Sequence, residues 1–201
     1  MNKAEIRTRN KIDKILTTII KLFSENDIKK VTMDDIARQA NVSKMTLYKY
    51  FGDRESLYKY VFKWVVKQHD SQLEKVFSSK DNTTQNMIAF LNVSVDFIDK
   101  MHYALCMKLS QFDDDIKKEF TSLNHKNKTI MIDLIMQGKK NMLISRDISN
   151  ECIYHYIDMG LCYYINNTDY RKKILSDNTF RKEFMTFLLS HVFVNFSHFD
   201  L

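Results

Sequence analysis

The residues that most suggest a chemical task lie between Lys44 and Tyr50. At helical spacing this stretch carries two lysines, two tyrosines, a methionine and a threonine: Lys44, Met45, Thr46, Tyr48, Lys49 and Tyr50. Ammonium groups reach phosphates or guanine edges, and a tyrosine offers both a hydroxyl and an apolar ring. Such a face suits the major groove of DNA. The alternative is a small helical hairpin whose aromatic residues form its core.

The segment before this row predicts a short helix followed by a tight turn. Thr32 can accept backbone N–H groups at a helix start, and Asp35 three positions later completes a capping box. The inward residues are apolar, and two are small enough for a second helix to cross closely: Ile36, Ala37 and Ala40. Asn41 follows where the chain must turn, and asparagine tolerates the left-handed conformation.

The second helix would hold the row outward. Ser43 is placed to cap it, and Leu47 and Phe51 share an inward face at a spacing of four residues. Gly52 can end this helix, and Asp53 can cap the next. Two short helices joined by a turn form a helix-turn-helix.

Residues 32–51 resemble the DNA-binding region of the TetR (tetracycline-repressor-like) family, whose usual pattern is T-x-x-x-I-A-x-x-A-G-V-S-x-x-T-L-Y-x-Y/H-F. The matching positions are Thr32, Ile36, Ala37, Ala40, Val42, Ser43, Thr46, Leu47, Tyr48, Tyr50 and Phe51. Asn41 stands where glycine is usual, and Met45 stands where a small residue is common. The resemblance is specific over about the first 63 residues.

The resemblance implies a DNA-binding surface that includes the start of the next helix, where Arg54 would touch the DNA backbone. The expected DNA-binding residues are Thr32, Ser43, Lys44, Met45, Thr46, Tyr48, Lys49, Tyr50 and Arg54. The charge distribution agrees with this placement. Residues 1–63 hold 14 Lys and Arg against 8 Asp and Glu, whereas residues 64–201 hold 17 of each. The excess positive charge therefore predicts a polyanionic partner for the N-terminal module alone.

The composition predicts an all-α protein, because the chain has no proline, three glycines and long amphipathic stretches. We expect a three-helix, helix-turn-helix domain over residues 1–55 and a helical ligand-binding and dimerisation domain over residues 56–201. Helical periodicity starts at Ile12, after a basic arm or first turn. Further helices are expected near 87–100, 103–112, 116–140, 150–166 and 177–197. Asp113, Asp114 and Asp115 are interpreted as a helix cap rather than a metal site.

The last helix is apolar almost all round, so it predicts cover from a partner as well as from its own chain. Phe184, Leu188 and Val192 lie on one side, and Phe187, Val194 and Phe193 lie toward the other. Gly160 on the neighbouring helix would allow a close approach. The expected interface residues of a four-helix homodimer contact are Tyr156, Gly160, Phe184, Phe187, Leu188, His191 and Val194.

The middle helices carry flexible and aromatic residues that suit an apolar ligand cavity, although ordinary helical core is equally consistent with each of them. The candidate ligand-binding residues are Trp64, Phe90, Phe97, Met101, Tyr103, Met107, Met131, Tyr154 and Asp158. The resemblance to ligand-responsive regulators favours a cavity. Asp158 or Asp96 would serve as a counter-charge if the ligand were cationic.

Enzymatic chemistry, cofactors and metals are not expected. The sequence holds no G-x-S-x-G, H-E-x-x-H or C-x-x-C motif, and its histidines are scattered singly. Cys106, Cys152 and Cys162 are interpreted as buried thiols in a reducing cytosol. With no secretory signal and no apolar run of ~20 residues, the chain is expected to be cytoplasmic and without a membrane partner.

These observations predict a homodimeric transcriptional regulator, usually a repressor in the resembled family, that binds a palindromic operator in double-stranded DNA. A small apolar or amphipathic effector would release it. One alternative is a DNA-binding dimer controlled by a protein partner or by no ligand. A different class of protein, a helical small-molecule-binding or enzymatic protein with an incidental basic end, is the remaining hypothesis.

Overall fold

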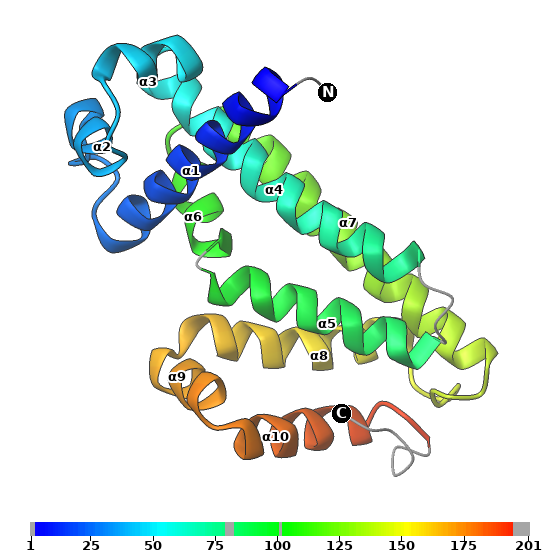
Figure 1. Ribbon diagram of the computed structural model, residues 1–201. Coiled ribbons are helices and arrows are strands. Elements are labelled where there is room, and N and C mark those ends of the chain that lie inside the picture. The colour runs from blue at the N-terminus through cyan, green and yellow to red at the C-terminus, as the bar shows by residue number, and fades with distance from the viewer. Residues whose placement is uncertain (1–2, 79–82, 101, 195–201) are drawn as a thin grey trace. The chain divides into compact units, whose positions relative to one another are not determined.

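The computed structural model describes residues 3–78, 83–100 and 102–194 and confirms the predicted all-α fold (Figure 1). Over these residues the helices are α1 (Lys3–Glu25), α2 (Met33–Gln39), α3 (Lys44–Phe51), α4 (Arg54–Ser78), α5 (Thr83–Asp99), α6 (His102–Leu109), α7 (Asp114–Lys140), α8 (Asn150–Asn166), α9 (Thr168–Ser176) and α10 (Asn178–Ser190). The chain packs as two compact units.

The first unit holds the chain up to Lys75 together with Asp96–Leu123, and the second holds Val76–Val95 and the chain from Asn124 onward. The predicted domain boundary after residue 55 stays a prediction. At that position α4 runs on without a break, since it begins at Arg54 and ends at Ser78. The helix-turn-helix and α4 are therefore joined directly rather than by a linker.

The first helix is longer than its apolar periodicity predicted. It begins at Lys3, whereas we expected an arm or first turn through residue 11 and regular helix from Ile12. The first eleven residues contain no glycine or proline, so nothing in them interrupts a helix that is anchored further along. That anchor is a buried stripe at three- and four-residue spacing: Ile15, Leu16, Ile19 and Phe23.

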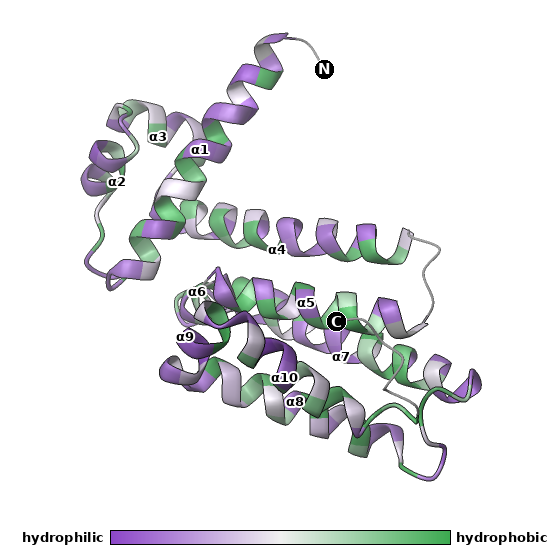
Figure 2. Cartoon of the chain, turned by 60° about the horizontal axis from the view of Figure 1, so that its bottom comes forward, coloured by the Kyte–Doolittle hydropathy of each residue, from purple (hydrophilic) through white to green (hydrophobic). Residues whose placement is uncertain are grey.

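One apolar cluster joins the helices of the first unit. Its fully buried members include Phe23, Leu47, Phe51, Leu57, Val61 and Phe62. Burying a side chain of this size stabilises the fold by about 1.5–3 kcal/mol. Green apolar turns alternate with purple polar turns along α1 and α4 in Figure 2, the pattern expected where each helix buries one face.

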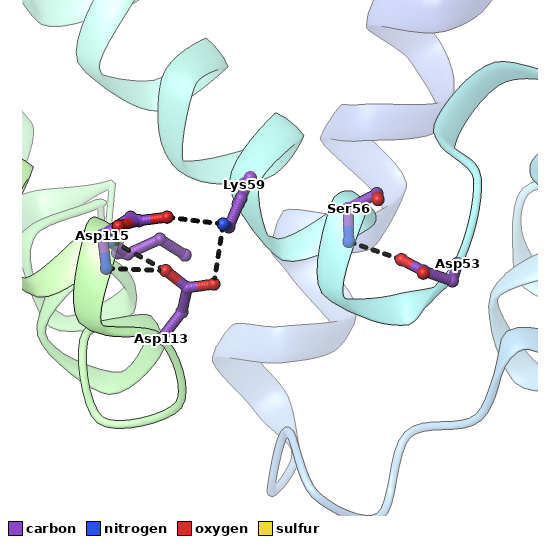
Figure 3. Close-up of polar contacts among 6 residues, drawn as sticks. Asp53, Ser56, Lys59, Asp113 and Asp115 are labelled. Carbon is purple, nitrogen blue, oxygen red and sulfur yellow. Dashed lines mark hydrogen bonds and ion pairs between the residues drawn. The ribbon is translucent and has the colours of Figure 1, made fainter.

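Of the three consecutive aspartates, Asp113 caps α7, as predicted, and Asp114 and Asp115 lie in the first turn of the helix. Asp113 Oδ1 accepts the backbone N–H groups of Asp115 at 2.9 Å and Ile116 at 3.0 Å, and the bond from Ile116 is the main reason that the pKa of Asp113 lies below its usual value. Lys59 Nζ on α4 lies 3.2 Å from Asp113 and 2.8 Å from Asp115 (Figure 3). These ion pairs tie α4 to the turn that precedes α7.

In the second unit, the Leu188 side chain of α10 packs against Gly160 of α8. A Cβ atom added at Gly160 would lie 3.3 Å from Leu188 Cδ1, and Leu188 is only 8% exposed. The expectation that Leu188 faces a partner chain is therefore corrected, because this side chain is covered within the protomer. Gly160 is half-exposed, and its contact with a partner chain stays a prediction. The close approach of the two residues is made within the protomer, because α10 fills the space that the absent side chain leaves.

The last helix is shorter than predicted. It ends at Ser190 rather than at residue 197, and positions 195–197 lie outside the described residues. After it the chain turns and pairs with an earlier segment: Val194 N–H donates to Leu143 O at 2.9 Å, and Phe193 pairs with Ile144 in an isolated bridge. Phe193, expected toward a partner, is instead 4% exposed within its own chain. Helix α9 was not predicted, and the caps Asn167 and Asp177 mark it off.

The cysteines fit the sequence interpretation only in part. Cys106 is buried, and burial raises the pKa of its thiol to about 12. Cys152 and Cys162 are exposed, so the prediction that they are buried is wrong. Both lie on α8, whose buried face is formed by Ile153, Ile157 and Tyr164. Within the described part of the chain, no helix combines the length and apolar character needed to cross a bilayer.

Candidate nucleic-acid interface

Thr32 starts α2 with the capping box that the sequence predicted. Thr32 Oγ1 accepts the backbone N–H of Asp35 at 3.1 Å, and Asp35 Oδ2 accepts the backbone N–H of Thr32 at 3.1 Å. The Thr32 hydroxyl also donates to Asp35 Oδ2 at 2.7 Å. The bonds from Thr32 lower the pKa of Asp35, because they favour the carboxylate. Thr32 therefore has a structural role whether or not it contacts DNA.

The turn between α2 and α3 depends on Asn41, which adopts the left-handed backbone conformation with φ of 52°. Asparagine is one of the few residues other than glycine that takes this conformation at low cost. Val42 N–H then donates to Ala37 O at 3.0 Å and closes the turn. Ile36 and Ala37 on α2 are 1% and 8% exposed, so the small face of α2 lies inward as predicted.

The orientation of α3 is fixed from both ends. Ser43 Oγ accepts the backbone N–H of Thr46 at 3.1 Å and caps the helix start. Leu47 and Phe51 are 0% and 2% exposed and hold the inward face in the core. Gly52 ends the helix with φ of 71°, and Asp53 Oδ1 caps α4 by accepting the Ser56 N–H at 2.8 Å (Figure 3).

With that inward face fixed, the opposite side of α3 faces solvent. Met45 is 81% exposed and Tyr48 is 47% exposed, and Lys44 and Lys49 are exposed beside them. An apolar chain, a phenol and two ammonium groups therefore project from two turns of one helix. The lysines can meet phosphates or guanine edges, and the methionine and tyrosine can contact thymine methyl groups.

Two residues of the predicted outward row are only half exposed. Thr46 lies next to the cap, and its hydroxyl is 2.8 Å from that of Ser43. Tyr50 packs partly on the core, with its ring centroid 6.3 Å from that of Phe51. Thr46 and Tyr50 lie at the border between the outward face of α3 and the inward face that Leu47 and Phe51 form. Their contact with DNA stays a prediction, and each already has a packing or capping role.

One partner within the interface was missed from the sequence. Lys44 Nζ lies 3.0 Å from Asp34 Oδ2 and 2.9 Å from Asp34 Oδ1, so an ion pair joins α3 to α2. The bond to Asp34 raises the pKa of Lys44. Ten residues separate the two, and periodicity within either helix gives no sign of the contact. The signal available was the packing of α2 on α3, which brings the first turns of both helices together.

Arg54 is half-buried and bound inside the first unit. Its guanidinium donates to the carbonyl oxygens of Ile28 at 2.6 Å and Lys29 at 3.0 Å, and its Nε donates to the Tyr58 hydroxyl at 2.8 Å. These bonds fasten the start of α4 to the segment between α1 and α2. The predicted contact of Arg54 with a DNA phosphate stays a prediction, and it would add to this structural role.

The candidate ligand residues divide between the two compact units. In the first unit, Phe97 is buried, the Tyr103 ring packs edge-on against Phe120 with the ring centroids 5.4 Å apart, and Met107 is exposed. In the same unit, Trp64 lines an open groove beside α1. In the second unit Phe90 and Met131 are buried, the Tyr154 ring lies under Lys128 Nζ at 4.9 Å and Asp158 accepts from Cys162. Met101 lies outside the described residues. A single ligand cavity formed by these residues stays a prediction.

Several expected interface residues meet on one surface of the second unit. The rings of Tyr156 and Phe187 lie 6.5 Å and 5.0 Å from that of His191, so α8 and α10 present them together. Phe187 is 66% exposed and Val194 is 56% exposed, whereas Phe184 is half-buried against Tyr170. The sequence did not predict Met159 or Tyr163 as interface residues, and they add two more exposed apolar side chains to α8.

Comparison with known proteins places the N-terminal segment in a family. Residues 15–61 match the family model described as bacterial regulatory proteins, tetR family. The negative transcriptional regulator IcaR of the biofilm operon icaADBC of Staphylococcus epidermidis is 26% identical over 121 residues, which are 56% of this chain and 62% of that protein. IcaR of Staphylococcus aureus strain Newman is 44% identical over 46 residues, which are 23% of this chain and 25% of that protein. The chain thus spans less than two thirds of these relatives.

The fold has a counterpart among solved structures. The ketosteroid transcriptional regulator KstR2 of Mycobacterium tuberculosis superposes with a TM-score of 0.66 over 90% of this chain and 94% of that chain, at 15% identity. At this identity the likeness concerns the fold alone. The matched family and the relatives named here are transcriptional regulators and not enzymes, in agreement with the class expected from the sequence.

Proposed function

This chain belongs to the TetR family of bacterial regulatory proteins through its N-terminal domain, and from that premise we propose that it is a homodimeric regulator that represses transcription from a palindromic operator. The observation that carries the proposal is the outward face of α3. Met45 and Tyr48 are exposed beside Lys44 and Lys49, while Leu47 and Phe51 hold the opposite face of the helix in the core. Repression is favoured because the S. epidermidis relative is named a negative regulator.

The homodimer is supported by the apolar surface of the second unit. Met159 and Tyr163 on α8 and Phe187 on α10 are all more than half exposed, an arrangement that is costly in water unless another surface covers it. Two copies related by a twofold axis would present two α3 helices. Their separation would match half-sites about 34 Å apart, or a multiple of it, on one side of DNA.

Release of the operator by a small apolar or amphipathic molecule completes the proposal. A ligand changes DNA affinity only if it binds one conformation better than another. The continuity of α4 supports this step, since the helix begins one residue after the Asp53 cap and runs to Ser78 with no linker behind the helix-turn-helix. Such a regulator would act in the cytoplasm, where bacterial DNA lies.

Selection of bound sequences from a random DNA pool, read by gel shift, tests the proposed function. We expect an inverted repeat to be enriched and the complex to weaken steeply as salt rises. The double variant Tyr48→Ala with Lys49→Ala should bind the selected repeat much more weakly, while its circular dichroism spectrum stays unchanged. Enrichment of no sequence, with a double variant that behaves like the wild type, would contradict the assignment of α3.

A further inference from the structure

An open groove lies between α1 and α4 in the first unit. Ile12 and Leu16 from α1 and Trp64 from α4 form its apolar part, and Lys59, Lys63 and Lys67 from α4 line it as well. Its volume is about 540 Å³. That value falls within the roughly 300–1,000 Å³ common for small-molecule sites. The proposed function makes no use of this groove.

The apolar part of the groove has a fixed shape. Leu16 is 1% exposed, and Trp64 is half-buried with its indole Nε1–H donating to Asp13 Oδ1 at 2.9 Å. This bond satisfies the polar atom of the indole and orients the ring, so the remaining ring surface is available for apolar contact. A ligand in the groove would therefore meet a preformed hydrophobic wall.

The lysines add a positive rim. They lie four residues apart, so Lys59, Lys63 and Lys67 share one face of α4. Lys59 is already paired with Asp113 and Asp115. Lys63 and Lys67 are exposed, and neither makes an ion pair with any residue that the structure describes. The two uncompensated ammonium groups beside an apolar wall define the chemistry that the groove would accept.

We propose that this groove binds an amphipathic carboxylate, a small molecule with an apolar chain or ring and one anionic end. The apolar body would lie against Ile12 and Trp64, and the carboxylate would accept hydrogen bonds from Lys63 and Lys67. A neutral molecule leaves the lysines unused, and a cation is repelled by them. A DNA phosphate would use the lysines but gains nothing from the apolar wall.

Binding of the ligand in the groove would also affect the helix-turn-helix. The two helices that form the groove also pack on α2 and α3 through the shared core. Ligand binding to the groove stands without the proposed function. An accompanying change in operator affinity rests on it.

The single tryptophan of the chain provides a direct measurement, because Trp64 is the only source of indole fluorescence and lies in the groove. Decanoate below its micelle concentration is added to the full-length protein without DNA. We expect a saturable change in emission. Acetate, which has the anion without the apolar chain, and decyltrimethylammonium, which has the chain with the opposite charge, should leave the emission unchanged.

Two variants of equal charge test the rim. Lys63→Ala with Lys67→Ala should raise the apparent Kd for decanoate at least tenfold, roughly the loss of one charge-assisted hydrogen bond. Lys21→Ala with Lys118→Ala removes the same charge from exposed positions outside the groove and should leave the Kd unchanged. All four substituted side chains are exposed, so both variants should keep the helical circular dichroism spectrum.

The inference is overturned if decanoate causes no saturable change, if decyltrimethylammonium binds equally well, or if both variants lose decanoate binding alike. It is also overturned if only DNA binding responds to the Lys63 and Lys67 substitutions, because the rim would then serve phosphates. A gel shift on the selected operator, performed separately, tests the proposed function. Decanoate binding without operator binding would retain the groove and reject the regulator.

Discussion

The outward face of α3 and the outward faces of α8 and α10 both expose large side chains, but of different kinds. On α3, Met45 and Tyr48 stand beside two lysines within eight residues. On α8, Met159 and Tyr163 are 62% and 55% exposed, and this helix contains no lysine or arginine. Mixed cationic and aromatic surface suits a polyanion, whereas apolar surface without cations suits another apolar protein surface.

The two regions also differ in how the chain supports them. Each end of α3 has an identifiable signal, with Ser43 as the first cap and Gly52 as the last, and its inner face is fully buried. The exposed apolar residues of α8 and α10 have no such local explanation. The comparison shows that α3 is a surface held in place by its own chain, and it supports the proposal that a second chain covers the α8 and α10 surface.

The largest effect is expected from placing charge in the α8 and α10 surface. Phe187→Glu with Val194→Glu should give a monomer, because two carboxylates would otherwise be buried in an interface larger than ~1,200 Å². A monomer contacts one half-site, so binding to the full operator should weaken roughly a thousandfold. Sedimentation at micromolar concentration and gel shift measure the two consequences.

A matched control separates the position of the charge from its amount. Thr168→Glu with Thr179→Glu adds the same charge at exposed positions at the starts of α9 and α10 and should leave the dimer intact. If the Phe187 and Val194 variant sediments as a dimer like this control, the dimer contact lies elsewhere. The exposed apolar side chains of α8 and α10 would then not mark the dimer contact.

A smaller effect is expected on the α3 face. Tyr48→Ala should weaken operator binding by about 1–3 kcal/mol, since it removes a hydroxyl and a ring that is 47% exposed without touching the core. Met136→Ala, which also truncates a half-exposed apolar side chain but on α7, should have no effect. Equal affinity of the Tyr48 variant and the wild type, with the fold retained, would contradict the placement of α3 in the groove.

The sequence predicted a feature when the residues that determine it lie close together in the chain. The Thr32 capping box, the left-handed Asn41 and the Ser43 cap each depend on residues within four positions, so reading the sequence was enough to place α2 and α3. The Lys44 and Asp34 ion pair and the packing of Leu188 on Gly160 join separate helices. Only the folded chain reveals which of several possible partners a side chain meets.

The same limit explains the end of the chain. An apolar run of the kind found after Phe184 fits a continued helix and fits an extended segment with both faces covered. Phe193 and Val194 leave the helix and pair with an earlier segment, because Leu143 and Ile144 offer a backbone partner about fifty residues earlier. Alternation and helical periodicity cannot be told apart when nearly every residue is apolar.

The cap of α2 tests how independent the α3 region is. Thr32→Ala should lower the free energy of unfolding by about 0.5–2 kcal/mol, because Asp35 N–H loses its acceptor. Denaturant titration measures this change. Thr121→Ala, which removes an exposed hydroxyl from the interior of α7, is the control. If both variants are equally stable, the capping box contributes nothing and α2 is held by packing alone.

The cap also gives a pH dependence with a defined sign. The pKa of Asp35 is lowered in the folded state, mainly by the Thr32 hydroxyl. Its contribution to stability is therefore full above the pKa of the unfolded chain, about 3.9, and is lost as the pH falls through the lower folded value. Unfolding followed between pH 6 and 2 (roughly the range that spans both values) should show a smaller acid-dependent loss in the Thr32→Ala variant. A loss as large as that of the wild type would contradict this role of the carboxylate.

The smallest effects concern the ion pair between the helices of the DNA-binding motif. In the complex, Lys44 must exchange Asp34 for a phosphate, so Lys44→Ala should reduce the slope of log affinity against log salt by about 1. Lys126→Ala, near the middle of α7, removes an exposed lysine outside the motif and should leave the slope unchanged. An unchanged slope in the Lys44 variant would mean that this ammonium stays with Asp34 in the complex.

Asp34→Asn alters the other partner of this ion pair, and we expect it to strengthen operator binding. The Asp34 side chain is 70% exposed, and exposed ion pairs contribute only about 0–1 kcal/mol, so the fold should be unaffected. The asparagine no longer holds Lys44 by charge and no longer repels phosphate, and operator affinity should rise about two- to fivefold at low salt and less at high salt. Gel shift at two salt concentrations measures this, with Asp70→Asn on α4 as the control for net charge. Weaker binding in the Asp34 variant would show that Asp34 positions Lys44 for DNA rather than competing with it.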